Sequence, residues 1–122
     1  MNSVVHFELP VSNMSRAREF YSRVFGWQLN KFDDRNTMVT TSQTDARGIP
    51  QKPGAINGSL YLPQRPSTPS VVVDVPDLRA HIAKVIENGG KLVDEPKTIP
   101  GLGMYARFED PEGNLVGLWQ NL

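Results

Sequence analysis

The sequence predicts a single α+β domain made of two successive strand–helix–strands units. The chain has 122 residues, a length that supports one hydrophobic core and not two independent ones. In each half, an alternating strand is followed by a capped amphipathic helix and then by short strands. A shift of 64 residues, which places Phe7 on Val71, also aligns the helix caps Asn13 and Asp77. We therefore predict that one unit has been duplicated.

The first unit, at residues 3–62, begins with a strand over residues 4–9. Apolar and polar residues alternate there, and successive side chains of a strand point to opposite faces. His6 and Glu8 consequently share one face, while Phe7 lies on the other. The segment is predicted to be a half-buried strand.

A helix and three strands complete the first unit. The side chain of Asn13 can accept a hydrogen bond from a free N–H of the first turn, and apolar residues then recur at helical spacing up to Phe25. Gly26 ends the helix, because glycine adopts the left-handed conformation of a C-terminal cap at little cost. Further strands are predicted at residues 27–32, 37–41 and 55–62.

The second unit, at residues 70–122, follows a proline-rich linker at residues 63–69. A strand at residues 70–75 leads to a helix that is capped by Asp77 and ended by Asn88-Gly89-Gly90. Short strands are then predicted at residues 91–93, 103–109 and 115–119. The turn at residues 110–113 has proline second and glycine fourth, as a type I turn prefers.

Composition and charge exclude several classes of function. The net charge is zero and no run of Lys or Arg occurs, so the basic patch that binds nucleic acid or an anionic membrane is absent. There is no cysteine, which excludes disulfides and thiolate nucleophiles. No apolar stretch approaches the roughly 20 residues of a membrane span, and the N-terminal residues lack the features of a secretory signal. We expect a cytoplasmic protein with a small-molecule or protein partner.

Three segments carry a family resemblance: residues 6–27, 71–90 and 108–115. The most specific parts are Phe20-Tyr21 with Phe25-Gly26-Trp27, and the Asp-Pro-Glu-Gly turn at residues 110–113. Together they resemble the vicinal oxygen chelate superfamily of glyoxalases, bleomycin-resistance proteins and extradiol dioxygenases, and in particular its small relatives of lactoylglutathione lyase. The resemblance implies two βαβββ modules whose strands form a curved half-barrel sheet around a cavity, with the helices outside. It also implies a homodimer.

Metal-using members of this family hold a divalent ion through side chains on the first and last strands of each module. The resemblance places His6 at the first ligand position, and the shift of 64 residues places Ser70 at its equivalent. The family's glutamate follows the turn by four residues, where this chain has Gly117, and residues 57–60 offer no carboxylate. One matched ligand is too few to hold an ion. We therefore predict neither a metal nor another cofactor.

The adjacent His6 and Glu8 have two interpretations. One is a hydrogen-bonded polar pair in which the carboxylate favours the protonated imidazole. The other is an acid/base or substrate-orienting pair, because histidine titrates near neutral pH. The sequence leaves both open.

Residues on the last two strands have further alternatives. Trp119 shares a face with Gly117 and either lines an apolar ligand pocket or packs in the core. Gly117 would leave space for a ligand. Arg107 either binds an anionic substrate or pairs with Glu109, and the sequence does not tell which face of residues 104–109 lines the cavity.

The leading hypothesis is a glyoxalase-like protein, enzymatic or not, that binds a small molecule in the half-barrel cavity. The expected ligand-binding residues are His6, Glu8, Ser70 and Trp119, and no catalytic residue is assigned. One alternative is a metal-dependent lyase or dioxygenase of the vicinal oxygen chelate type. Another is a drug-sequestering resistance protein.

Overall fold

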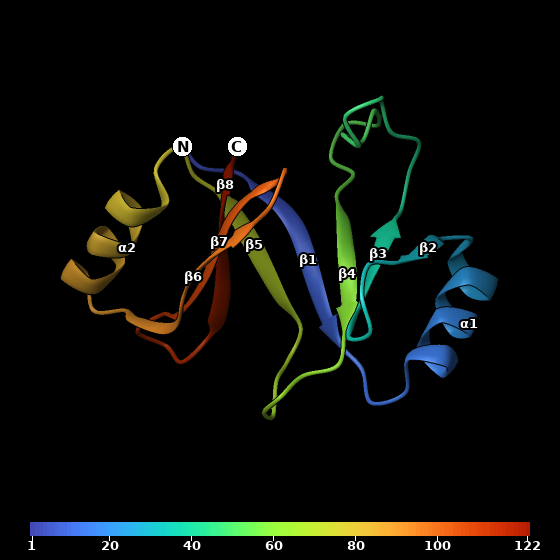
Figure 1. The fold of residues 1–122 in the computed structure, drawn as a ribbon, viewed down its shortest axis with the longest axis horizontal. Helices are drawn as coiled ribbons and strands as arrows, with labels where there is room; N and C mark the ends of the chain where they lie inside the picture. The colour runs from blue at the N-terminus through green and yellow to red at the C-terminus, as the bar shows by residue number, and fades with distance from the viewer. The chain divides into compact units, whose positions relative to one another are not determined.

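The computed structural model describes residues 1–122 and contains eight β-strands and two α-helices. The chain divides into two compact units (Figure 1). One, called module one, consists of residues 6–69, and the other, called module two, consists of residues 1–5 and 70–122. In each module the strand–helix–strands order is βαβββ. This order confirms the predicted α+β fold with two βαβββ modules.

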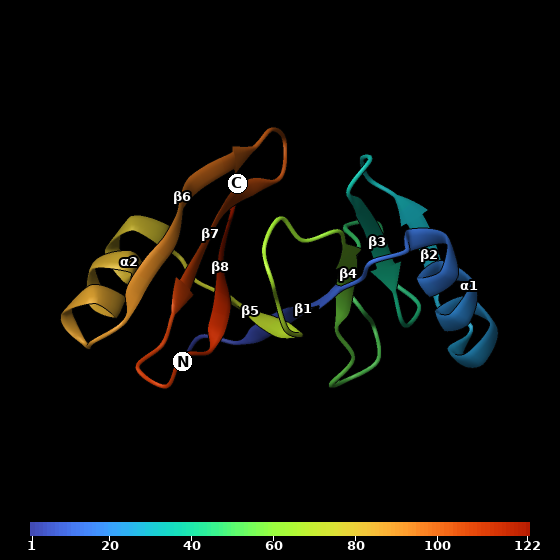
Figure 2. The same ribbon diagram turned by 90° about the horizontal axis from the view of Figure 1, so that it is seen from below.

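Module one has a four-stranded sheet and one helix. Its elements are β1 (Val4–Pro10), α1 (Met14–Phe25), β2 (Gln28–Lys31), β3 (Asn36–Thr40) and β4 (Asn57–Tyr61). β4 pairs with β1 in parallel and with β3 in antiparallel orientation, and β3 pairs with β2, which gives the order β2-β3-β4-β1. In both ribbon views, α1 lies against one side of these strands (Figures 1 and 2).

Aromatic rings join the helix of module one to its sheet. Tyr21 of α1 stacks on Trp27 with ring centroids 4.9 Å apart, and Trp27 lies 5.6 Å from Phe7 of β1. The Phe7 ring crosses β4 at Gly58, where a Cβ would come within 2.5 Å of it. The side chain of Leu60 is fully buried in the same core. Gly58 is thus required for close packing of Phe7 on the sheet.

Module two repeats this arrangement. Its elements are β5 (Ser70–Asp74), α2 (Leu78–Glu87), β6 (Lys91–Ile99), β7 (Gly103–Glu109) and β8 (Leu115–Asn121), with the strand order β5-β8-β7-β6. The buried core consists of Val75, Leu78, Ala106 and Leu118. Neither α1 nor α2 is long and apolar enough to cross a membrane.

The predicted helix caps are confirmed in both modules. Asn13 Oδ1 accepts a hydrogen bond from the N–H of Arg16, and Asp77 Oδ1 accepts one from the N–H of Ala80. Gly26 is left-handed, with φ of 69°. The helices begin at Met14 and Leu78, which keeps the shift of 64 residues.

The second strand predicted for module two is too short. Residues 91–93 are only the beginning of β6, which continues through Pro96 to Ile99. β6 is the outer strand of this module's sheet, and its register with β7 shifts between Leu92 and Asp94 and again between Asp94 and Lys97. Proline, which has no N–H to donate, is tolerated at such an edge with bulges. Because proline is rare inside strands, the sequence analysis ended this strand before Pro96.

Candidate functional site

The strand face of module one that points away from α1 is polar. Strand pairing places His6 beside Asn57 and Glu8 beside Ser59, and Met38 of β3 lies on the other side of Ser59. Directly paired residues share a face of the sheet. The predicted alternation of β1 is therefore confirmed: His6 and Glu8 lie on one face and Phe7 lies on the other.

His6 is electrically neutral at neutral pH. Its Nε2 lies 3.4 Å from Ser59 Oγ, a long hydrogen bond to a side chain that is almost fully buried. Burial removes water from the imidazole and lowers the pKa of His6 to about 4. Burial therefore shifts the pKa of His6 in the direction opposite to the one expected if Glu8 favoured the protonated imidazole.

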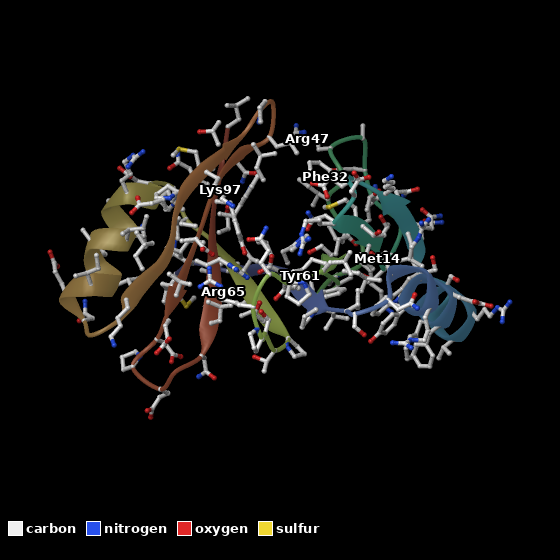
Figure 3. All side chains as sticks on the ribbon, turned by 60° about the horizontal axis from the view of Figure 1, so that its bottom comes forward. Met14, Phe32, Arg47, Tyr61, Arg65 and Lys97 are labelled. Atoms are coloured by element: carbon white, nitrogen blue, oxygen red, sulfur yellow. The ribbon has the colours of Figure 1, made fainter.

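Tyr61 is a residue of the same face that the sequence did not single out. It ends β4 (Figure 3) and is only 9% exposed. Its hydroxyl is buried and has no hydrogen-bond partner, which is unusual because a buried, unpaired hydroxyl is energetically unfavourable. Nothing in the alternation of β4 distinguishes this tyrosine from an ordinary core residue.

The structure shows which face of β7 is polar in module two. Tyr105 is paired with Trp119 and Arg107 with Gly117, so these four residues share one face. The intervening residues pack on the opposite face with the core around Leu78 of α2; they are Met104, Ala106 and Phe108. The structure thus shows which set of β7 residues packs on the helix side and which set lies on the opposite, polar face.

Gly117 does not leave a space. A Cβ built on it would lie 2.9 Å from Val72 Cγ2, 3.0 Å from Tyr105 Cε2 and 3.2 Å from Tyr105 Oη. The tyrosine ring fills the volume that a side chain at residue 117 would occupy. The expectation of room for a ligand at this point is therefore wrong.

Arg107 pairs with a residue that the sequence analysis missed. Its Nε donates to Asp94 Oδ2 at 3.0 Å, and the two side chains are only 16% and 26% exposed. The alternative in which Arg107 pairs with Glu109 is wrong, because the ion pair is with Asp94. Asp94 was overlooked because the strand was predicted to end at residue 93, one residue before it.

Trp119 and Ser70 complete the residues predicted for module two. The indole Nε1 of Trp119 donates to Asn121 Oδ1 at 2.9 Å, and Asn121 in turn donates to Asp74. The ring lies so close to Gly103 that a Cβ there would be 2.8 Å from it. Module two thus fixes the indole, and ligand contacts of Trp119 would come from its ring carbons. Ser70 is the half-buried first residue of β5.

The family's metal-ligand positions do not carry suitable donors in this chain. Val72 is paired with Gly117 just as Glu8 is paired with Ser59, so Ser59 is the counterpart of Gly117 in module one. The four positions therefore hold His6, Ser59, Ser70 and Gly117, which supply one imidazole, two hydroxyls and no carboxylate. No group of three His, Cys, Asp or Glu side chains is arranged to hold an ion. Divalent metals in proteins prefer imidazole, thiolate and carboxylate ligands, and this donor set does not fit them.

Two surface hollows occur elsewhere. One, of about 370 Å³, is lined by residues of α1 and by Leu29, and the other, of about 390 Å³, by the N-terminal residues, Asp74 and Asn121. Neither is lined by His6 or Trp119. The candidate site is therefore chosen by the hydrogen-bonding groups on the polar strand faces and not by the presence of a pocket.

Comparison with known proteins places the chain in one superfamily. The family model of the Glyoxalase/Bleomycin resistance protein/Dioxygenase superfamily matches residues 3–118. "Putative glyoxylase CFP32" of Mycobacterium tuberculosis is 30% identical over 93% of this chain. A glyoxylase-like domain-containing protein of Didymella fabae is 31% identical over 88% of this chain and 84% of its own length. The chain spans only 43% of the length of the mycobacterial relative.

Solved structures show the same fold. Methylmalonyl-CoA epimerase from Mycobacterium tuberculosis has a TM-score of 0.69 at 19% identity, with 98% of this chain and 87% of the epimerase covered. A superfamily member from Vibrio splendidus has a TM-score of 0.65 at 20% identity, with both chains fully covered. At such identities, the likeness concerns the fold. With two βαβββ modules and a family match over residues 3–118, the chain belongs to the glyoxalase/bleomycin resistance protein/dioxygenase superfamily.

Proposed function

We propose that this protein binds a small organic molecule through residues of its polar strand faces, without the divalent metal of its metal-using relatives. The residues proposed for ligand binding are His6 and Glu8 of module one and Ser70 and Trp119 of module two. The observation that carries the proposal is the donor set at the four family positions, in which Ser59, Ser70 and Gly117 accompany His6. The imidazole and the two hydroxyls suit hydrogen bonding to a ligand better than coordination of an ion, and Gly117 adds no ligand atom.

The electrostatics of His6 support a role in ligand binding. A neutral imidazole can donate from one ring nitrogen and accept at the other, and the low pKa of His6 keeps it neutral across the physiological range. Ser59 Oγ holds Nε2 and thereby restricts the orientation of the ring. A preorganised neutral group of this kind would suit a carbonyl or hydroxyl group of a ligand.

One observation favours a second candidate, a metal-dependent lyase or dioxygenase. Metal coordination requires a deprotonated imidazole, and His6 is in that form at neutral pH. The missing carboxylate argues against this candidate, because a single histidine with hydroxyls binds divalent ions weakly. For this candidate, ligand binding would depend on added metal.

The location and assembly are part of the same proposal. We propose a cytoplasmic homodimer. The dimer is what the family resemblance implies, and the cytoplasmic location is the expectation from the sequence. Sedimentation equilibrium of the purified chain measures the assembly. A single species of 13.6 kDa at all concentrations would contradict the dimer.

Ligand binding is tested by thermal unfolding in the presence of EDTA. Methylmalonyl-CoA, the ligand in one solved epimerase complex with this fold, is the first probe, followed by small carbonyl compounds and organic acids. A ligand that binds the native state raises Tm in a saturable manner. We expect His6→Ala to abolish the rise and His81→Ala, a histidine on α2, to preserve it. A rise that requires added divalent metal would support the second candidate, and the absence of any rise would contradict both.

A further inference from the structure

We infer that the hollow between α1 and β2 is a binding site for a small oxyanion, a carboxylate or a phosphate, with Arg18 as its cationic group. The hollow has a volume of about 370 Å³ and is lined by four residues of α1 and by Leu29 of β2. Pockets that bind small molecules range from about 300 to 1,000 Å³. The inference goes beyond the proposed function, because it assigns a second ligand to another part of module one.

The hollow lies on the face of the module-one sheet opposite to His6. Leu29 is paired with Val39, and Val39 is paired with Gly58. Gly58 is also paired with Phe7. Because directly paired residues share a face, Leu29 lies on the face of Phe7, and α1 lies next to β2 in both ribbon views (Figures 1 and 2). A ligand in this hollow would therefore not touch the polar strand face.

The charge of Arg18 carries the inference, because it has no acidic partner. The side chain is half-buried, and its hydrogen bond runs from Nη2 to the carbonyl oxygen of Leu29 at 3.4 Å. None of the ion pairs of the chain includes Arg18. A half-buried cation without a counter-ion is energetically unfavourable. An anion bound in the hollow would supply that counter-ion.

The guanidinium of Arg18 has donors left for such an anion. It carries five N–H groups in a planar fork that matches the oxygens of a carboxylate or a phosphate. The bond to Leu29 uses one N–H and holds the group beside the hollow, so four N–H groups remain. The arginine can thus bind two oxygens of one anion.

Two serines flank Arg18 in the hollow, one helical turn before it and one after it. Ser15 is exposed, and its hydroxyl has no partner in the chain. The hydroxyl of Ser22 donates to the carbonyl oxygen of Glu19 at 3.2 Å and keeps its own oxygen as an acceptor. The stripe of α1 that lines the hollow therefore offers a further donor and an acceptor.

The acidic residue of the hollow is compensated by another arginine. Glu19 Oε1 lies 2.6 Å from Arg23 Nη2, and both side chains are exposed. The two arginines and one glutamate together leave one positive charge, which is that of Arg18. The hollow therefore suits an anion and not a cation. The side chain of Leu29 adds an apolar contact for a short hydrocarbon part of an organic acid.

The test measures the binding of malonate and of inorganic phosphate by isothermal titration calorimetry, at constant ionic strength set with NaCl. In parallel, NMR follows the side-chain Nε–H signal of Arg18, which reports on this site alone. We expect a saturable heat and a saturable shift of that signal with at least one of the two anions. The anion that binds more tightly distinguishes a carboxylate ligand from a phosphate ligand.

Two arginine variants separate this site from general attraction of anions. Arg18→Gln should weaken binding about tenfold or more, because it removes charge-assisted hydrogen bonds. Arg16→Gln is the matched control and should leave binding unchanged. Arg16 is an exposed arginine of the same helix, its guanidinium donates to Ser12 Oγ, and it does not line the hollow.

Glu19→Gln tests the charge of the hollow and leaves the bond between Arg18 and Leu29 in place. Without the carboxylate, the charge of Arg23 adds to that of Arg18, so the anion should bind several-fold more tightly. If the hollow is only an irregularity of the surface, the substitution leaves the affinity unchanged. Because Glu19 is exposed, this variant keeps the test decisive even if Arg18→Gln fails to fold.

Three outcomes would overturn the inference. They are no saturable response of the wild type to either anion, an Arg18→Gln variant that binds as tightly as Arg16→Gln, and unchanged or weaker binding by Glu19→Gln. None of them bears on His6, which lies on the other face of the sheet. If carbonyl compounds still bind through His6 while malonate and phosphate leave the Arg18 signal unmoved, the proposed function stands and the oxyanion site alone is refuted.

Discussion

Acidification provides a sensitive probe of the site, because His6 must be neutral in the folded protein. Burial lowers the pKa of His6 from 6.5 to about 4, whereas in the unfolded chain the imidazole regains its ordinary pKa. Between these two values the unfolded state binds more protons than the native state, so stability falls as the pH falls. Well above pH 6.5 the imidazole is neutral in both states, so it no longer contributes to the pH dependence of stability.

The magnitude follows from the size of the shift. A difference of about 2.5 pKa units, at about 1.4 kcal/mol each, corresponds to a loss of about 3 kcal/mol between pH 7 and pH 4. Such a loss is a large part of the total of about 5–15 kcal/mol that stabilises a small domain. The protein should therefore be markedly less resistant to urea at pH 4.5 than at pH 7.

The assay compares the wild type with His6→Gln, which cannot titrate. Urea unfolding of both proteins at several pH values between 4 and 8 gives the free energy of unfolding, and the difference between them isolates the contribution of His6 from that of the carboxylates. NMR titration of the imidazole signals, assigned with His81→Gln, gives the pKa directly. Parallel pH profiles for the two proteins, or a measured pKa of His6 above 6, would refute the buried neutral imidazole.

Urea unfolding at pH 7 tests three contacts of the fold. Gly58→Ala should cost about 1–3 kcal/mol, because the new methyl group would lie 2.5 Å from the Phe7 ring; an equal cost in a Phe7→Leu background would rule out this clash. Leu78→Ala should cost about 2–5 kcal/mol, since Leu78 is fully buried in module two, and a cost below about 1 kcal/mol would contradict that packing. Asp77→Ala should cost about 1 kcal/mol through loss of the hydrogen bond to the N–H of Ala80, whereas Asp77→Asn should cost little; equal costs would show that capping is not the cause.

Local chemistry made most of the fold predictable. A cap at Asn13, a left-handed glycine at residue 26 and the alternation of β1 are short-range signals, and each appears in the structure as expected. The duplication added a second signal, because Asp77 repeats the role of Asn13. The strand through Pro96 was missed, since the tolerance of an edge strand for proline depends on its neighbours and not on its own residues.

The candidate site was less predictable, because it depends on pairings between distant strands. Alternation identifies two sets of residues on β7 but not which set packs on α2, and Asp94 could not be matched to Arg107 without the irregular register of β6. Likewise, no sequence pattern indicates that the Tyr105 ring lies over Gly117. The burial of His6 could not be predicted from the sequence either. It lowers the pKa of His6, whereas one interpretation of the pair with Glu8 favoured the protonated imidazole.

The central claim is that the family's metal-ligand positions are not a set of metal ligands in this chain: His6, Ser59 and Ser70 supply hydrogen-bonding groups, and Gly117 supplies no side chain. Competition with a chromophoric chelator measures the affinity of the purified protein for Zn²⁺, Mn²⁺ and Ni²⁺ most directly, with His6→Ala as the comparison. We expect weak binding of each ion that is the same in both proteins. Stoichiometric, tight binding of any of them that disappears in His6→Ala would contradict the account.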